Sequence, residues 1–87
     1  MKIKYHKRFL KNFRKRIASN SKLVEQFEER LEIFQENQKD PILKDHKLKG
    51  EREEYRAFSV GGDLRVVYKA VGDEIWLYDI GTHNQVY

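Results

Sequence analysis

The 87-residue sequence has no cysteine, one proline and no long apolar run, and each of these absences excludes a class of protein. Without cysteine, disulfide and thiolate chemistry are impossible, so the redox state of the compartment does not constrain the fold. No stretch approaches the roughly 18 consecutive apolar residues of a membrane-spanning helix, and the N-terminal residues lack the apolar core of a signal peptide. We therefore expect one cytoplasmic domain over residues 1–87 that does not bind a membrane.

Acidic residues are also missing from residues 1–24, which carry nine Lys and Arg side chains. Residues 25–87 carry nine basic and fourteen acidic side chains, so the net charge of +4 conceals a strongly basic N-terminal segment. A concentrated positive surface attracts a polyphosphate or an acidic protein chain. A solvated helix face without a partner is the alternative that charge alone leaves open.

Hydrophobic spacing predicts a strand followed by two helices in the first half of the chain. Residues 2–5 alternate as a short strand, and apolar side chains then recur with helical spacing from Phe9 to Ile17. Ser19-Asn20-Ser21 favours a break, because these side chains bond to nearby backbone. A second helix is expected to extend to about Gln38, so that the two helices form an αα-hairpin.

The second half of the chain predicts a loop and then a three-stranded antiparallel meander. Pro41 ends the helical region, and the polar residues 40–54 are expected to form a loop. From Tyr55 the apolar period changes to two, and Gly61-Gly62 supplies a tight hairpin turn. The expected strands cover residues 55–60, 64–70 and 74–80. The fold class is therefore α+β, with the helices packed on one sheet face to bury their phenylalanines.

No metal or cofactor site is expected, because the three histidines are far apart and lack the spacing of metal ligands. The remaining polar residues suit RNA cleavage, in which a 2′-OH attacks the neighbouring phosphate. His46 and His83 fit the roles of base and acid, since histidine exists in both protonation states near neutrality. Arg65 and Arg56 fit the need for positive charge, because a guanidinium matches phosphate oxygens.

Each of these residues also has a structural interpretation that the sequence leaves open. His46 and His83 could be ordinary exposed histidines, and the two arginines could occupy the polar face of a strand. Asp63 could orient a histidine, although the hairpin turn is its commoner role. Tyr87 could stack on an unpaired base, as aromatic rings do in RNA recognition, or could be disordered as the last residue.

A longer pattern is formed by Asp45-His-Lys-Leu-Lys-Gly50, Tyr55-Arg56, Asp63, Val66-Val-Tyr68 and Gly81-Thr-His83 with an aromatic residue four positions later. In order and spacing it resembles the RelE/ParE superfamily of bacterial toxins, most closely the YafQ-like branch. The resemblance implies a β-α-α-β-β-β fold and a ribosome-dependent endoribonuclease that cuts messenger RNA. Two positions depart from the pattern, because Ala57 and Ser59 stand where the YafQ-like strand carries an aspartate and a histidine.

Site residues follow from the same resemblance. The positions that match the YafQ-like active site are His46, Asp63, His83 and Tyr87. Arg65 matches an arginine that contacts the scissile phosphate in the RelE branch. We expect His46 to act as base and His83 as acid, with Arg65 and Arg56 on the phosphate and Tyr87 on a base or the 2′-OH. The residues expected to bind RNA are Arg56, Lys47, Lys49, Lys11, Arg14 and Lys15.

The expected partners are a cognate antitoxin, messenger RNA and the ribosome, with DNA contacted only through the antitoxin. Two other functions stay open on this fold. One is a ParE-like toxin that inhibits DNA gyrase as a protein-binding module, although such a binder has no need of His46 and His83. The other is an inactive RNA-binding relic. His6, Trp76 and Tyr78 are assigned to structural roles.

Overall fold

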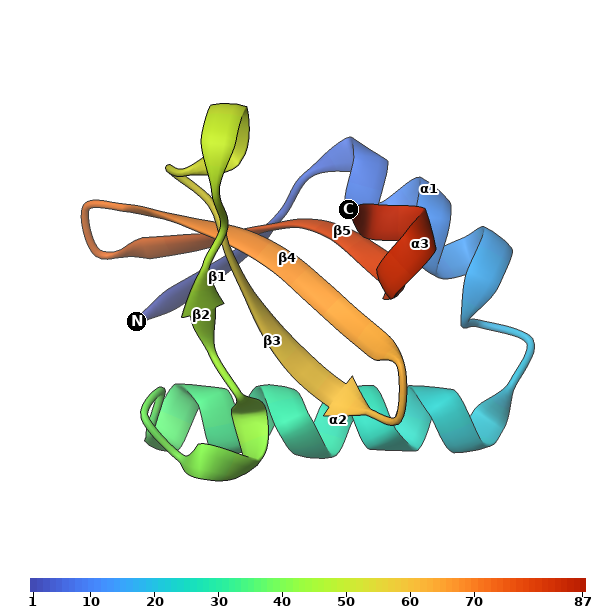
Figure 1. Cartoon of the computed structure of the whole chain (residues 1–87). Coiled ribbons are helices and arrows are strands. Elements are labelled where there is room, and N and C mark those ends of the chain that lie inside the picture. The colour runs from blue at the N-terminus through green and yellow to red at the C-terminus, as the bar shows by residue number, and fades with distance from the viewer.

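A computed structural model describes the backbone of residues 1–87 and every side chain except that of Glu51. Figure 1 shows the elements in chain order. They are β1 (Lys2–Tyr5), α1 (Lys7–Arg16), α2 (Ser21–Glu36), the 3₁₀-helix η1 (Pro41–Leu43), β2 (His46–Lys47), the 3₁₀-helix η2 (Gly50–Arg52), β3 (Arg56–Gly61), β4 (Leu64–Val71), β5 (Glu74–Thr82) and α3 (His83–Val86). The predicted α+β class, with one strand, two helices and then further strands, is confirmed.

Local hydrogen bonds explain where the two long helices begin. The imidazole of His6 accepts from the backbone N–H of Arg8 at the start of α1. The side chain of Asn20 accepts from the N–H groups of Lys22 and Leu23 at the start of α2. The predicted break at residues 19–21 is therefore confirmed, because a side-chain oxygen satisfies backbone donors that have no partner within the helix. The second helix ends at Glu36, two residues before the predicted limit.

The five strands form one sheet in the order β1-β5-β4-β3-β2. β3, β4 and β5 make the predicted antiparallel meander. β1 extends the sheet by pairing parallel to β5, with Ile3 opposite Ile75. The αα-hairpin and the meander separate β1 from β5 in the sequence, yet these first and last strands lie side by side in the sheet (Figure 1).

Two segments depart from the sequence prediction. Residues 40–54, expected as a loop, contain η1, β2 and η2, because Leu43 is fully buried and His46 pairs with Ala57 on β3. The last strand, expected to end at residue 80, continues to Thr82 and is followed by α3. The side chain of Gln85 accepts from the backbone N–H of Thr82 at 2.8 Å, which supports the first turn of that short helix.

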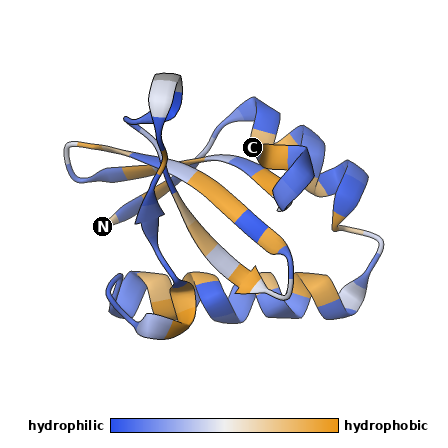
Figure 2. Ribbon diagram, viewed as in Figure 1, coloured by the Kyte–Doolittle hydropathy of each residue, from blue (hydrophilic) through white to orange (hydrophobic). Residues whose placement is uncertain are grey.

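Apolar side chains lie on both faces of the sheet. The main core joins α1 and α2 to one face through Phe9, Phe27, Phe34, Phe58 and Leu77, and hydrophobic residues line the sheet side of α2 in Figure 2. A smaller cluster on the opposite face consists of Leu48, Ala57, Val67 and Val86, with Tyr55 and Tyr78 packed against it. We call this second surface the α3 face. Within the described part of the chain, no helix combines the length and apolar character needed to cross a bilayer.

Candidate active site

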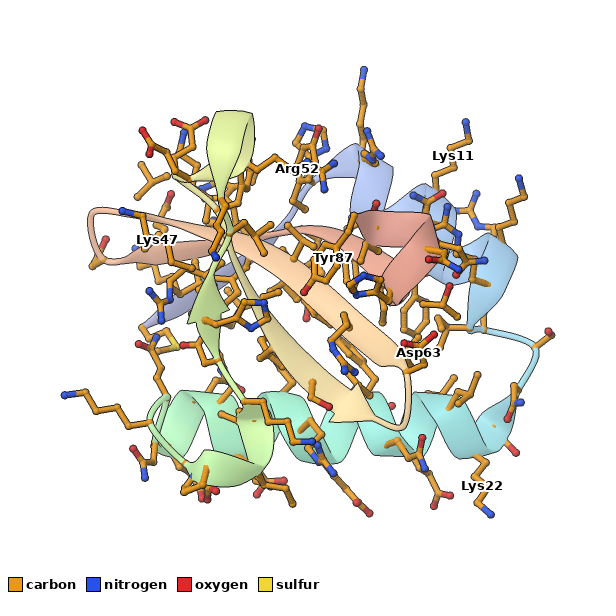
Figure 3. All side chains as sticks on the ribbon, in the orientation of Figure 1. Lys11, Lys22, Lys47, Arg52, Asp63 and Tyr87 are labelled. Carbon is orange, nitrogen blue, oxygen red and sulfur yellow. The ribbon has the colours of Figure 1, made fainter. Side chains whose placement is uncertain are left out.

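The register of the strands brings candidate residues together on the α3 face. His46 is paired with Ala57, and Arg65 is paired with Ser59. Residues that face each other across antiparallel strands project to the same side of the sheet. α3 continues from the end of β5 on this side and is followed by Tyr87, which Figure 3 shows beside α3 over the sheet. Residues from β2, β4 and α3 therefore converge, although they are far apart in the sequence.

The ring of Tyr87 lies between the two predicted acid–base histidines. The centroids of Tyr87 and His83 are 4.6 Å apart in an edge-to-face arrangement, and those of Tyr87 and His46 are 6.3 Å apart. The Tyr87 hydroxyl lies 3.4 Å from Nε2 of His46. All three side chains line one pocket of ≈ 400 Å³. The structure thus brings together three of the five residues predicted to be catalytic.

A backbone contact determines which nitrogen of His46 is free to react. Nδ1 of His46 lies 3.0 Å from the carbonyl oxygen of Lys44. A carbonyl oxygen can only accept, so Nδ1 carries a proton in this hydrogen bond. In the neutral imidazole Nε2 is then unprotonated, and it is this nitrogen that faces the Tyr87 hydroxyl. The neutral imidazole of His46 therefore presents a nitrogen that can accept a proton to the pocket.

Cationic side chains surround the pocket. Lys47, Lys49 and Arg52 line it with the histidines, which places two of the four predicted RNA-binding lysines at its rim. Arg52 also donates through Nη1 to the carbonyl oxygen of Val86 and so holds the end of α3. Partial burial raises the pKa of Tyr87 above its ordinary value, while the charges of Arg65 and Arg52 oppose that rise. Arg52 was not among the predicted residues, and its place in the polar segment 40–54 was the signal available for it.

Arg65 and Asp63 lie beside the hairpin turn between β3 and β4. Nη1 of Arg65 donates to the carbonyl oxygens of Gly62 and Leu64, at 2.9 and 3.2 Å, and approaches Oγ of Ser59 at 3.5 Å. Asp63 is exposed in the turn (Figure 3) and, among the described side chains, forms no hydrogen bond or ion pair with either histidine. The structure therefore favours the turn role for Asp63, and a catalytic role for it stays a prediction.

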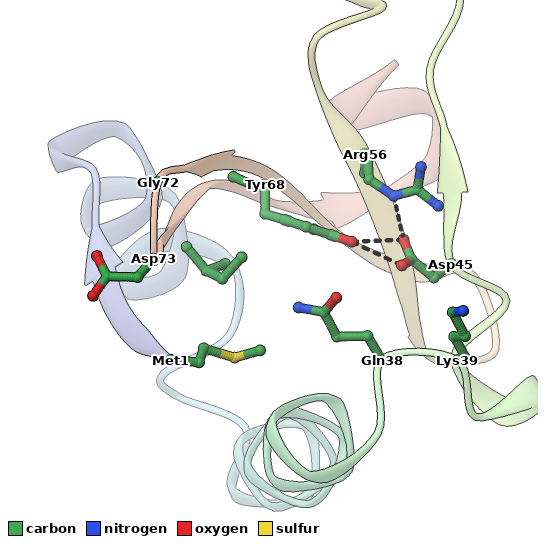
Figure 4. A pocket seen from close by; sticks show the side chains of 10 residues that line it. Met1, Gln38, Lys39, Asp45, Arg56, Tyr68, Gly72 and Asp73 are labelled. Atoms are coloured by element: carbon green, nitrogen blue, oxygen red, sulfur yellow. Dashed lines mark hydrogen bonds and ion pairs between the residues drawn. The ribbon is translucent and has the colours of Figure 1, made fainter.

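The position of Arg56 differs from the prediction, because the structure places it outside the pocket. It projects from β3 on the side of Phe58, towards α2, because side chains alternate along a strand. There its Nε lies 3.3 Å from Oδ1 of Asp45, next to the hydroxyl of Tyr68 (Figure 4). Arg56 is thus on the opposite face from the histidines. It binds the residue that precedes His46 instead of joining the pocket.

The basic first helix packs against β5, the strand that continues into α3. The predicted RNA-binding residues Lys11, Arg14 and Lys15 are exposed along it. Two further arginines on this helix are partly neutralised by Asp79, which is 1% exposed. Arg8 and Arg16 each lie 3.4 Å from its carboxylate. A basic surface is therefore present, but these two arginines also hold α1 against β5.

Among the described side chains, no three His, Cys, Asp or Glu residues converge as a metal site would require. The candidate site is a pocket in which two imidazoles and a phenol meet among arginines and lysines. Such a set can move protons and neutralise an anion. Transfer of a phosphoryl group between two oxygen atoms uses both abilities. Protons move from the attacking oxygen and to the leaving oxygen, and positive charge stabilises the phosphate.

Comparison with known proteins identifies the family. The sequence matches the family model of YafQ, a bacterial toxin of type II toxin–antitoxin systems. The match covers residues 1–87, the whole chain. The chain belongs to the YafQ toxin family. A search of curated protein sequences found no match.

Solved structures agree with the assignment of this chain to the YafQ family. A copper-bound mutant toxin from Helicobacter pylori is 27% identical, with a TM-score of 0.78 over 100% of this chain and 99% of the other. YafQ from E. coli strain BL21(DE3) is 21% identical, with a TM-score of 0.77 over 98% and 96%. YafQ in the E. coli DinJ–YafQ complex is 24% identical, with a TM-score of 0.70 over 98% and 96%. The two E. coli structures show that this YafQ-family toxin has the same fold.

Proposed function

We propose that this toxin is a ribosome-dependent endoribonuclease that cuts messenger RNA with the residues of the α3-face pocket. The observation that carries the proposal is the convergence of His46, His83 and Tyr87 from separate elements onto one pocket. A module that only binds a protein has no requirement for two imidazoles around a phenol. The whole-chain match to the YafQ family supports the same reading.

The proposed reaction is an attack of a 2′-oxygen on the adjacent phosphorus. Nε2 of His46 takes the proton of the 2′-OH as the new P–O bond forms. The bond from phosphorus to the 5′-oxygen breaks, and His83 donates a proton to that oxygen. The products are a 2′,3′-cyclic phosphate and a free 5′-OH. Each proton transfer typically accelerates such a reaction by about 10²–10⁴-fold.

The positive charges around the pocket support a role in stabilising the phosphate in the transition state. The phosphate gains negative charge in the transition state, and fixed cations beside it lower the barrier. Arg65 and Arg52 are close enough to oppose the rise in the pKa of Tyr87. We assign these two arginines to the phosphate, together with Lys47 and Lys49 at the rim. Tyr87, between the imidazoles, is assigned to the 2′-OH or to the base that carries it.

The proposed partners follow from the family and from charge. A cognate antitoxin is proposed because the related toxin is found in a complex with DinJ. The exposed cations of α1, Lys11, Arg14 and Lys15, are proposed to contact ribosomal RNA, for which phosphate contacts give a salt-sensitive affinity. Cleavage would then take place in the cytoplasm, where messages are translated.

A cell-free bacterial translation reaction tests the proposal, with the message mapped by primer extension. Wild type should produce discrete cuts at codon-related positions, and His83→Ala should lose about 10²–10⁴-fold of this activity. Asn84→Ala is the matched control, because it changes an exposed neighbour on the same helix that does not line the pocket. Intact message with normal translation would refute the nuclease and favour the gyrase-inhibitor alternative.

The assignment of acid and base has its own test. A message with sulfur in place of the bridging 5′-oxygen at the cut has a leaving group that needs no proton. With this substrate, His83→Ala should recover most of the lost rate and His46→Ala should not. Recovery of His46→Ala instead would reverse the two roles.

A further inference from the structure

Aromatic side chains form a second concave surface on the α3 face, away from the proposed active site. Tyr55, Trp76 and Tyr78 line a pocket of ≈ 460 Å³ together with His6. All four side chains are partly exposed. They come from the residue before β3, from β5 and from the residue before α1. We call Tyr55, Trp76 and Tyr78 the aromatic platform.

The rings of the platform are close to one another and are held in place. The centroids of Tyr55 and Tyr78 are 5.0 Å apart, and those of His6 and Tyr78 are also 5.0 Å apart. The indole Nε1 of Trp76 donates to Oε1 of Glu74 at 3.1 Å. A ligand that binds here meets ring surfaces whose orientation is already set, which lowers the entropy lost on binding.

Cations flank these rings. The pairing registers place Lys4 on β1 and Lys69 on β4 on either side of Trp76, all three on the α3 face. Arg8 lies over the ring of Tyr78, with 5.2 Å to its centroid, and Nζ of Lys69 lies 5.8 Å from that of Tyr55.

Two acidic groups are close to the platform as well. Glu54 is 3.4 Å from the ammonium of Lys69, and Glu74 accepts from Trp76. Both carboxylates therefore have partners in the protein. Lys4 adds positive charge on the side of the platform that faces β1, and Arg8, which shares the buried carboxylate of Asp79 with Arg16, adds part of a charge on the side of α1.

The platform and the proposed active site lie on the same face of the sheet and are linked by a buried apolar cluster. Tyr55 and Tyr78 pack against the cluster of Leu48, Ala57, Val67 and Val86. Val86 belongs to α3, and Leu48 also lines the pocket of His46, His83 and Tyr87. A strand of RNA cut in that pocket could therefore reach the platform along one side of the sheet.

We propose that the aromatic platform binds an unpaired base of the single-stranded RNA, outside the two nucleotides that flank the cut. This deepens the proposed function and rests on it. Aromatic rings flanked by cations suit single-stranded nucleic acid, because the rings stack on bases while the cations meet the phosphates. Stacking is tolerant of sequence, so the platform would contribute affinity and direction to the strand, not codon choice.

Fluorescence of Trp76 tests the proposal directly, because it is the only tryptophan in the sequence. The probe is a 2′-O-methyl hexanucleotide, which binds but cannot be cut, at constant salt. We expect saturable quenching of Trp76 by this RNA and none by an abasic sugar–phosphate chain of the same charge. Tyr78→Leu should weaken the binding on the order of tenfold or more, as expected for the loss of a stacking partner.

Tyr5→Leu is the matched control, since Tyr5 is 42% exposed on β1 but pairs with Leu77 and packs on Phe9, on the opposite face. Its RNA affinity should equal that of wild type. Equal quenching by the abasic chain, no quenching by RNA, or quenching only by an acidic antitoxin peptide would each overturn the platform. None of these outcomes depends on cleavage, so message cutting by wild type separates a failed platform from a failed nuclease.

Discussion

The hydroxyl of Tyr68 lies 2.9 and 2.8 Å from the two carboxylate oxygens of Asp45, and this contact holds the residue that precedes His46. Tyr68 is only 2% exposed and belongs to the main core. Arg56 binds the same carboxylate from β3 (Figure 4). The proposed base is therefore attached to the core through its neighbour, from the face of the sheet opposite the active site.

Tyr68→Phe is expected to destabilise the toxin and to reduce its activity. The change removes a hydrogen bond to a charged group that is largely shielded from water, worth about 1.5–3 kcal/mol. It also frees the backbone that presents His46, so cleavage should fall even at temperatures where the protein stays folded. Urea unfolding and primer extension measure the two effects. Tyr5→Phe, which removes a hydroxyl with no hydrogen-bond partner among the described residues, should match wild type. A Tyr68→Phe variant as stable and active as that control contradicts the anchoring role.

Alkaline pH should weaken the fold through the same tyrosine. Burial first, and then the hydrogen bond to Asp45, raise the pKa of Tyr68 above its ordinary value. In the unfolded chain the phenol loses its proton near pH 10, while the folded state still retains it. The unfolded state then binds fewer protons, so the free energy of unfolding falls as the pH rises above about 10. Comparing urea unfolding of wild type and Tyr68→Phe from pH 8 to 11 isolates this contribution, and an unchanged difference between them would refute it.

Arg52→Ala should lower cleavage by misplacing α3. The guanidinium donates to the carbonyl oxygen of Val86, so its loss releases the turn that carries His83 and Tyr87. A shift of about 1 Å in reacting groups can cost roughly 100-fold in rate. Lys22→Ala removes an equal charge from α2, well away from Tyr87 in Figure 3, and should leave the rate unchanged. Equal rates for both variants in the translation assay would exclude a role for Arg52.

Gly81→Ala should disturb the same turn by crowding. A Cβ at this position would lie 2.7 Å from Nη1 of Arg16 and 2.7 Å from Oε1 of Gln85, so both side chains must move. The Gln85 contact to Thr82 would be lost, at a cost typical of overpacking, about 1–3 kcal/mol. Gly72→Ala is the informative contrast. Its φ of +62° makes alanine strained, but no atom lies within 4 Å of the new Cβ. Both variants should unfold at lower urea, but only Gly81→Ala should also lose cleavage beyond its loss of stability.

The sequence predicts the elements whose apolar period persists over many residues. It predicts poorly the elements that depend on contacts between residues far apart in the chain. The helix pair and the meander follow from apolar spacing that persists over many residues. η1, β2 and α3 span only two to four residues each, too few for a period to be read. Their places depend on burial of Leu43 and Val86 by parts of the chain far away in the sequence.

The difference between local sequence pattern and long-range contact also explains which predicted site residues the structure brings together. His46, His83 and Tyr87 were chosen for their chemistry and family pattern, and the structure brings them together. Arg56 was chosen for its charge, but its side of the sheet depends on the phase of β3 relative to the core, which places it with Phe58. Arg52 lies in a segment with no periodic pattern, and its contact with Val86 depends on the tertiary fold.

The parallel pairing of β1 with β5 has a consequence for the synthesis of the toxin. Ile3 meets Ile75, so one edge of the sheet cannot close until the last strand has been translated. Contacts across such a separation in sequence slow folding, because a long loop must be ordered before they form. The helix that presents His83 follows that strand directly. The proposed active site therefore assembles only after β5 has been translated and paired, so we expect the growing chain to lack it until that stage.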